Sequence, residues 1–586
     1  MIVPIRPALR VAFAFAIAHG WLAGASAAEP VRATEQMVVT ANPHASEAGI
    51  RILRAGGSAV DAAIAVQLVL SLVEPQSSGV GGGAFMLVHD VPDDQPSPSS
   101  AGGSAEIVAY EGRETAPAAA TPEMFLDDRG GESSFLDVAF GGLSVGVPGA
   151  MRMLERAHRD HGRLPWAELF VPAIELAESG FEVSPRLYFL LDRFRRIAQA
   201  ERFLAYFYDE DGAPRETGFR LVNTEYAATL RLLAAQGADA MYTGELAERI
   251  VEAVAINVIR PGGMTLEDLG NYEARTTAAL CSPYRQWRVC GPRPPSSGGI
   301  AVQQILGILE AYDAPALTDD PVQSIHLIAE ASRLAFADRN LYLGDPDFVD
   351  VPVAALLNRE YLGSRAALID PDRALDSVSP GSPQPDIAWN FAPGKPTEVE
   401  STSHFSIVDR WGDAVSMTTT VQGAFGSQLM VGGFILNNQL TDFSFVPEVD
   451  GRPVANRPQA RKRPLSSMSP SLVYDADGRL RLLVGSPGGT RIINYVAQAI
   501  VGALDQGLNI QDAVAAPHFV AQDRLLELEQ GTAIVDHAAA LRRLGHNVAP
   551  RTLNSGLHGI AIDYADGGRV LSGGADPRRE GVALGD

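Results

Sequence analysis

The sequence contains only two cysteines among its 586 residues, Cys281 and Cys290. Two cysteines are too few for a disulfide-stapled scaffold. Neither a CxxC nor an HExxH motif occurs, so no zinc site is predicted. The pair brackets an eight-residue segment with a turn; in an exported protein it could close a disulfide, and two buried free thiols are a nearly equal alternative.

Long apolar runs are also missing, because no stretch reaches the roughly 18 uninterrupted apolar residues of a membrane-spanning helix. The first 28 residues combine Arg6 and Arg10 with a short apolar run over 11–18 and a small-residue end at 25–28. This pattern predicts a secretory signal peptide. We therefore expect a soluble, periplasmic or secreted protein, with an uncleaved N-terminal anchor as the alternative.

Positive charge is scarce as well: 47 Lys and Arg stand against 70 Asp and Glu, a net charge of −23. This balance argues against nucleic acid and anionic membranes as partners.

The glycine-rich segment 79–83 lies between a predicted helix over 58–70 and a predicted strand over 84–88. That order is the reverse of dinucleotide and P-loop sites, so we interpret these glycines as close backbone packing. The sequence predicts neither a cofactor nor a metal.

The most informative segment is a predicted β-hairpin, which joins residues 401–408 to 414–421 through the loop 409–413. Asp and Gly occupy this loop, as hairpin connections favour. If Val408 pairs with Ala414, then Thr402 lies opposite Thr420 at the open end.

The chain before the hairpin, over 380–397, is rich in proline and glycine and is predicted to be a mobile linker. Its abrupt end before Thr402 suggests that the bond between Ser401 and Thr402 is cut. Cleavage would give Thr402 a free amine with a pKa of roughly 7.7–8.0, a usable base beside its own hydroxyl. The alternative is that Thr402 merely begins a β-strand.

The remaining sequence divides into a mainly helical block over 148–375 and a later group of short motifs. The motifs end with Gly488 and Gly489, between a predicted strand over 480–484 and a helical pattern over 492–504. Such a loop can present backbone N–H groups to an oxyanion.

The order of these motifs closely resembles the γ-glutamyltranspeptidases, also called glutathione hydrolases. The matching segments span nearly all of the mature chain: 56–63, 81–87, Arg113, 294–299, 402–406, 437–443, 464–470 and 485–489. The resemblance implies an α+β fold, the four-layer αββα sandwich of the N-terminal-nucleophile hydrolases. It also implies a precursor that cuts itself into a large subunit, 29–401, and a small subunit, 402–586, which remain together as a heterodimer.

The resemblance implies a role for each catalytic residue. Thr402 would take the γ-glutamyl group from glutathione and related compounds and pass it to water, an amino acid or a peptide. Thr420 would orient the nucleophile, and Gly488 and Gly489 would supply the oxyanion N–H groups.

The resemblance further places the substrate's glutamyl head group. A planar guanidinium suits a carboxylate, and Arg113, Ser466 and Ser467 fall at the positions that bind the α-carboxylate. Asp442 and Gln439 fall at those that hold the α-ammonium. Gln422 stands where many members carry Asn.

One segment departs from the family. Residues 443–465 are shorter than a full lid and contain no tyrosine, which predicts a more open pocket. Four basic residues lie there: Arg457, Arg461, Lys462 and Arg463. We interpret them as a solvated basic loop, with attraction of anionic substrates as the alternative.

Two other functions stay open. A cephalosporin or glutaryl acylase of the same fold would need Thr402 but not the ammonium-binding Asp442 and Gln439. A non-catalytic γ-glutamyl peptide-binding protein would need neither Thr402 nor Thr420.

Overall fold

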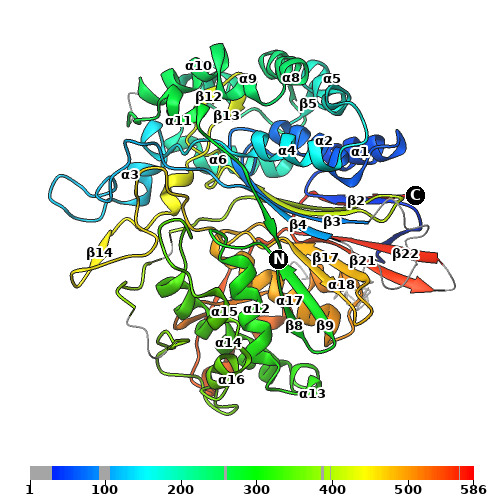
Figure 1. The fold of residues 1–586 in the computed structure, drawn as a ribbon, viewed down its shortest axis with the longest axis vertical. Helices are drawn as coiled ribbons and strands as arrows, with labels where there is room; N and C mark the ends of the chain where they lie inside the picture. Colours follow the sequence, from blue (N-terminus) through cyan, green and yellow to red (C-terminus); the bar gives the residue numbers. More distant parts are fainter. Residues whose placement is uncertain (1–28, 92–105, 257–259, 385–388, 396, 566–567) are drawn as a thin grey trace, which may run out of the picture.

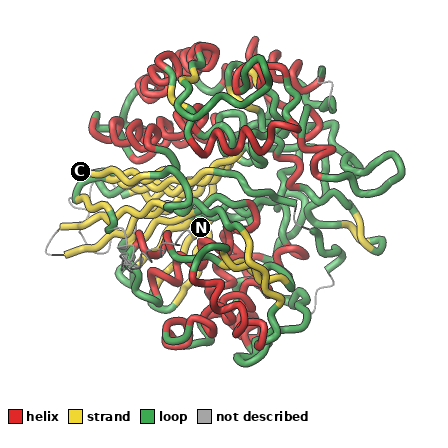
Figure 2. Tube along the Cα trace, turned by 180° about the vertical axis from the view of Figure 1, so that it is seen from behind, coloured by secondary structure: helices red, strands yellow, loops and turns green. Residues whose placement is uncertain are grey.

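The computed structural model describes residues 29–91, 106–256, 260–384, 389–395, 397–565 and 568–586. The predicted signal peptide lies outside these residues. Two antiparallel sheets of seven strands lie face to face at the centre, with helices covering both outer faces (Figures 1 and 2). The predicted four-layer αββα sandwich is confirmed.

The first sheet contains the predicted hairpin. In spatial order its strands are β23 (Val582–Gly585), β2 (Met37–Thr40), β10 (Ser403–Val408), β11 (Ala414–Thr420), β3 (Gly83–Asp90), β4 (Glu106–Gly112) and β7 (Arg275–Ala278). Strands from before and after residue 402 are therefore mixed within one hydrogen-bonded sheet.

The second sheet is built in the same mixed way. Its order is β1 (Val31–Ala33), β22 (Gly568–Ala575), β21 (His558–Ala565), β17 (Leu480–Gly485), β16 (Ser471–Tyr474), β9 (Trp287–Gly291) and β8 (Leu280–Tyr284). An apolar layer that includes Leu87 and Val408 from one sheet and Leu483 and Ile560 from the other fills the space between them.

Helices bury their apolar faces on the outer side of each sheet. The first layer contains α1 (Pro43–Arg54), α2 (Ala59–Val73), α4 (Ala150–His161), α5 (Val171–Ser179), α6 (Pro185–Phe194), α8 (Thr224–Gln236) and α10 (Gly244–Ala255). The second contains α12 (Gly298–Leu309), α14 (Pro321–Tyr342), α16 (Arg359–Ala366), α17 (Ile492–Leu504) and α18 (Ile510–Ala515). Each layer encloses its own hydrophobic core.

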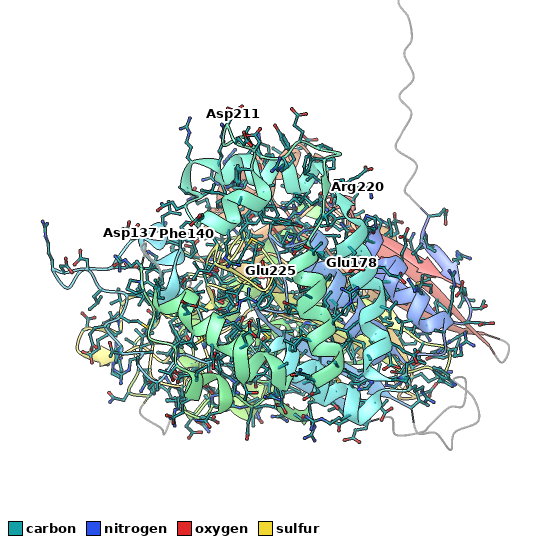
Figure 3. The ribbon with its side chains drawn as sticks, turned by 90° about the horizontal axis from the view of Figure 1, so that it is seen from above. Asp137, Phe140, Glu178, Asp211, Arg220 and Glu225 are labelled. Atoms are coloured by element: carbon teal, nitrogen blue, oxygen red, sulfur yellow. A yellow bond between two sulfur atoms is a disulfide. The ribbon has the colours of Figure 1, made fainter. Side chains whose placement is uncertain are left out.

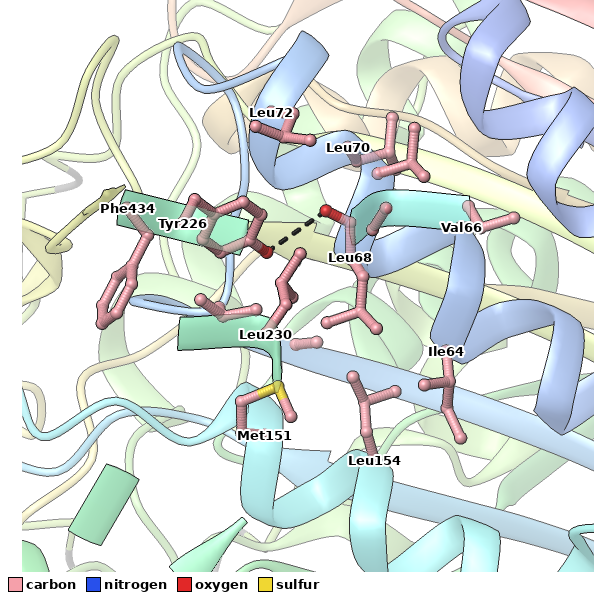
Figure 4. Close-up of a cluster of buried hydrophobic side chains, with 14 of the residues drawn as sticks. Ile64, Val66, Leu68, Leu70, Leu72, Met151, Leu154, Tyr226, Leu230 and Phe434 are labelled. Atoms are coloured by element: carbon pink, nitrogen blue, oxygen red, sulfur yellow. Dashed lines mark hydrogen bonds between the residues drawn. The ribbon is translucent and has the colours of Figure 1, made fainter. Parts of the chain in front are cut away.

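Helix α2 shows why the sequence pattern located these helices well. Ser58 caps its N-terminus in a reciprocal capping box with Asp61, and every residue of the helix is buried. Figure 4 shows its side chains packed beside Met151, and the Tyr226 hydroxyl donating to the Leu68 carbonyl at 3.2 Å. On the outer surface, Figure 3 shows Glu178 and Glu225 among charged side chains that pair with neighbouring arginines.

The glycines of segment 79–83 permit close backbone contact, as predicted. A Cβ atom on Gly82 would lie 2.0 Å from the Thr420 carbonyl oxygen, and one on Gly81 would lie 2.2 Å from that of Ile435. Only glycine therefore lets this loop approach the end of β11.

The block 148–375 is mainly helical, as predicted, and also contributes strands that include β7, β8 and β9. Cys281 and Cys290 are direct cross-strand partners in β8 and β9 and form a disulfide. β13 (Phe434–Ile435) is a short strand, and the Asn437 side chain that follows it bonds the backbone of Gly81 and Gly146.

No helix within the described ranges combines the length and apolar character needed to cross a membrane.

Acid should destabilise the protein through His558, a fully buried side chain at the start of β21. Burial lowers its pKa to about 4, so this ring stays neutral in the folded protein while the unfolded chain takes up a proton near pH 6.5. Stability is therefore lost as the pH falls from about 6.5 towards 4, by about 2 kcal/mol between pH 7 and 5. Urea unfolding at both pH values should show His558→Gln losing about 2 kcal/mol less than the wild type. Equal losses would contradict this origin.

Candidate active site

The register of the central hairpin is confirmed. β10 and β11 pair from Ser403 with Thr419 to Val408 with Ala414, which leaves Thr402 beside Thr420. The Thr402 hydroxyl donates to Thr420 Oγ1 at 3.0 Å, and the Gln422 backbone N–H donates to the same oxygen at 2.8 Å. Thr420 therefore fixes the direction of the Thr402 hydroxyl in a buried site.

The backbone at Thr402 is strained. Its φ of 91° lies in the left-handed region, which costs a β-branched residue about 1–3 kcal/mol. Hydrogen bonds hold the conformation on both sides: the Gly488 N–H donates to the Ser401 carbonyl at 3.1 Å, and Arg579 Nη1 donates to the Thr402 carbonyl at 2.9 Å. The residue with this left-handed backbone therefore directly follows the peptide bond between Ser401 and Thr402.

The glycine loop before α17 reaches this bond because of its unusual backbone. Gly488 and Gly489 have φ values of 135° and 59°. A Cβ on Gly489 would lie 2.6 Å from the Val399 carbonyl oxygen. Glycine at both positions thus allows a backbone N–H to approach the Ser401 carbonyl.

The predicted head-group residues converge on Asp442, a buried carboxylate. Arg113 Nη2 and Gln439 Nε2 donate to its Oδ2 at 2.7 and 2.6 Å, and Gln422 Nε2 donates to Oδ1 at 2.9 Å. Arg113 also donates to the Pro464 carbonyl at 3.0 Å. Asp442 is therefore the place where four segments meet. They are the chain just after β4, the chain just after β11, the 3₁₀ turn at Gln439–Asp442 and the chain before Ser466.

Three polar atoms around Asp442 have no hydrogen-bond partner in the described part of the chain: Arg113 Nη1, Gln422 Oε1 and Gln439 Oε1. Buried polar groups are normally paired, so each such atom needs an explanation. One cationic donor and two neutral acceptors beside a carboxylate complement an α-amino acid, whose carboxylate needs donors and whose ammonium needs acceptors.

The neighbouring Glu114 does not change this set of donors and acceptors around Asp442. Burial raises its pKa to about 8, although Arg113 opposes the shift. Near neutral pH the Glu114 carboxyl group is largely uncharged. Arg113 Nη1 lies 3.7 Å from the Glu114 carboxyl group, and the closer carboxylate, 2.7 Å from Nη2, is that of Asp442.

These groups line a small cavity of about 10 Å³. Its walls include Arg113, Thr402, Thr420, Gln422, Gln439, Asp442, Ser466 and Gly489, together with Glu398 and Val399. Gly488 and Ser467 adjoin it through their bonds to Ser401 and Glu398. The structure thus brings all ten predicted site residues together, and residues just before Thr402 close the space.

The basic segment before this site differs from the prediction. Lys462 and Arg463 are buried: Lys462 Nζ donates to the Ala455 carbonyl at 2.7 Å, and Arg463 pairs with Glu111 at 2.8 Å. The interpretation as a solvated loop is wrong for these two, because the Ala455 carbonyl of the same segment accepts from Lys462, while Glu111, far away in the sequence, pairs with Arg463. Arg461 does lie at the surface, 3.6 Å from Glu267.

Sequence reasoning missed three charged residues near the bond between Ser401 and Thr402. Arg339 lies inside α14, Glu398 lies at the end of the linker predicted to be mobile, and Arg579 precedes β23. Far from being free, the linker end is packed, with Thr397 Oγ1 donating to the Thr441 carbonyl at 2.7 Å. A charged residue inside a buried helix is a signal of this kind, but it does not single out Arg339, because Glu330, Arg333 and Asp338 are buried in the same helix.

A second buried cluster joins His326 and Glu330 of α14 to His546, with potential ligand atoms within 4.8 Å of one another. His326 Nδ1 bonds His546 Nε2 and its Nε2 bonds the Asp370 carbonyl, both at 2.8 Å. Glu330 accepts from Arg333 and from the Leu375 N–H. These bonds account for the cluster as an interior hydrogen-bond network.

Comparison with known proteins agrees with this geometry. The family model for gamma-glutamyltranspeptidase matches residues 45–586. The glutathione hydrolase proenzyme of Escherichia coli is 38% identical over 563 residues, covering 94% of this chain and 91% of that protein.

Acylases are also similar to this chain, in sequence and in structure. The acylase ACY 1 proenzyme of a Pseudomonas species is 36% identical, covering 95% of this chain and 94% of that protein. The crystal structure of a cephalosporin acylase from Bacillus halodurans superposes with a TM-score of 0.80 at 27% identity, covering 95% of this chain and 97% of that one.

Proposed function

Because the chain belongs to the γ-glutamyltranspeptidase family, we propose that it is a γ-glutamyltransferase and glutathione hydrolase that processes itself before Thr402. The observation that carries the proposal is the set of unpaired atoms around Asp442, which complements the head group of a γ-glutamyl donor. The substrates are glutathione and related γ-glutamyl compounds; the acceptors are water, amino acids and peptides.

Processing begins at the peptide bond between Ser401 and Thr402, next to the left-handed backbone of Thr402. The Thr402 hydroxyl attacks the Ser401 carbonyl carbon, an ester forms, and the C–N bond breaks as the hydroxyl proton passes to nitrogen. The Gly488 N–H, already on the Ser401 oxygen, stabilises the negative charge that develops there. Water then hydrolyses the ester, which leaves a carboxylate on Ser401 and restores the hydroxyl of Thr402, now with a free amine.

The freed amine serves as the base for substrate turnover. It accepts the Thr402 hydroxyl proton as the oxygen attacks the γ-carbonyl of the donor, and the proton passes on to the leaving amine. Water or an acceptor amine then attacks the acyl-enzyme and regenerates Thr402. Thr420 orients the nucleophile, while Gly488 and Gly489 stabilise the oxyanion.

The two products of processing, 29–401 and 402–586, form one heterodimer. Both sheets contain strands from each product, so separating them would break sheet hydrogen bonds along β2, β10, β11 and β3. The first 28 residues direct the precursor to the periplasm or the exterior.

Substrate preference distinguishes this enzyme from an acylase of the same fold. We expect the processed protein to turn over γ-glutamyl-p-nitroanilide with a kcat/KM at least about 10²-fold above that of glutaryl-p-nitroanilide, since only the former places an ammonium on Asp442. Equal or faster turnover of the glutaryl compound would indicate an acylase. Binding of glutathione without turnover of either would indicate a non-catalytic binding protein.

A further inference from the structure

Glu74, the residue that follows α2, places a buried carboxylate beside the start of the central hairpin. The Ser403 hydroxyl, which accepts from the Ser78 hydroxyl at 3.1 Å, donates to Glu74 Oε2 at 3.4 Å. The same carboxylate oxygen lies 3.8 Å from Nη1 of Arg579. This Nη1 is the atom that donates to the Thr402 carbonyl at 2.9 Å. Glu74 is therefore linked to the nucleophile through two neighbours, Ser403 and Arg579.

Two arginines share this carboxylate. Arg186 Nε lies 3.8 Å from Glu74 Oε1, and Arg579 Nη1 lies 3.8 Å from Oε2. The side chains of Arg186 and Arg579 are 13% and 1% exposed, so water solvates neither guanidinium well. Among the residues that the structure describes, Glu74 supplies the carboxylate at ion-pair distance from both. A single negative charge therefore separates two positive charges.

The shared charge matters most for Arg579, the more deeply buried of the two. Burial and the charge of Arg186 lower the pKa of Arg579 to about 9, while Glu74 and Asp576 oppose this shift. Arg579 is therefore cationic near neutral pH. If Glu74 lost its charge, the two guanidinium groups would repel each other in an interior where an uncompensated charge is strongly unfavourable. We expect the Arg579 guanidinium then to leave the Thr402 carbonyl.

We propose that Glu74 is a positioning residue, which holds the Arg579 guanidinium on the Thr402 carbonyl against repulsion from Arg186. It thereby fixes the nucleophile for self-cleavage and for turnover. The inference rests on the proposed function and adds a residue that acts through Ser403 and Arg579. The Nε–H of Arg579 donates to the Ser555 carbonyl at 2.7 Å, so Nη1, the nitrogen nearest to Glu74, is the one that serves Thr402.

The first test measures the rate of self-cleavage of freshly synthesised protein on denaturing gels. Glu74→Gln keeps an acceptor for Ser403 but removes the charge, and it should be cut about 10²-fold more slowly than the wild type. Glu74→Asp, which keeps the charge on a shorter side chain, should be cut at an intermediate rate. The matched control is Glu330→Gln, a buried glutamate that pairs with Arg333 at 2.7 Å, and its cleavage should be as fast as that of the wild type. Wild-type cleavage in Glu74→Gln would overturn the proposal.

The second test removes the competing cation. Glu74→Gln/Arg186→Met should be cut at a rate within about tenfold of the wild type, because Arg579 then no longer faces a like charge. A merely structural role for Glu74 predicts no such recovery, since the double variant loses both side chains. If the single and the double variants were equally slow, whether through misplacement of the backbone or through lost folding, the proposal would fail.

The third test uses the cut protein. Glu74→Gln should lower kcat for γ-glutamyl-p-nitroanilide by about tenfold and leave KM within about twofold, because it disturbs the nucleophile and not the groups around Asp442. A raised KM with an unchanged kcat would contradict the assigned role. A wild type that is never cut before Thr402 would instead refute the proposed function, whatever the Glu74 variants do.

Discussion

Replacing Thr402 with alanine should leave the chain as one uncut polypeptide and lower turnover of γ-glutamyl-p-nitroanilide by about 10⁴-fold or more. The change removes the hydroxyl that attacks Ser401 in processing and the donor in turnover, and loss of a nucleophile typically costs this much. Gly488 and Arg579 would still hold the surrounding backbone, so folding should persist. A denaturing gel and an anilide assay on the same preparations measure both effects.

Thr402→Ser is the matched control for this experiment. It keeps the hydroxyl and removes the methyl group, whose branch at Cβ adds to the cost of the left-handed backbone at this position. We expect it to be cut, more slowly because less strain is relieved, and to retain activity. An uncut wild type that turned over the donor would refute the assignment of Thr402.

Asp442→Asn should reduce kcat/KM for the γ-glutamyl donor by about 10³-fold while leaving processing intact. The substitution keeps the shape but removes the charge that pairs with Arg113 and, in our proposal, with the substrate ammonium; losing one partner of a buried pair costs about 3–5 kcal/mol. Processing should continue because the bonds that hold the scissile carbonyl come from Gly488 and Arg579. Steady-state kinetics on the cut protein provide the measurement.

The control is Asp338→Asn, another buried aspartate, which pairs with Arg365 at 3.3 Å away from the cavity. It should alter stability more than donor preference. If Asp442→Asn retained the wild-type preference for γ-glutamyl over glutaryl anilide, the ammonium pocket would have to be placed elsewhere.

The features that were predictable from sequence are those set by local chemistry. The alternation of side chains along a strand and the hairpin loop 409–413 predicted the register of β10 and β11. This register places Thr402 beside Thr420. Capping residues and glycines located α2, α4 and α10. The strain at Thr402 and the contact of Gly488 with Ser401 could not be read from residue types, because they depend on how a distant loop meets the hairpin.

The wrong predictions concern contacts that depend on the fold and not on the local sequence. A charged residue in a proline-rich or basic stretch is predicted to face water, yet Glu398 and Arg463 find partners in distant elements, and Lys462 is buried against the Ala455 carbonyl. Glu398 meets Arg339 across 59 positions, and Arg463 meets Glu111 across a still longer separation. Such pairs become visible only when the fold is known.

The most direct test of the account is the N-terminal sequence of the small fragment from the purified wild-type protein. We expect it to begin with Thr402-Ser403-His404, with a mass that matches residues 402–586. A fragment that begins at any other residue, or an active protein that contains no such fragment, would contradict the proposed nucleophile and the pocket assigned around it.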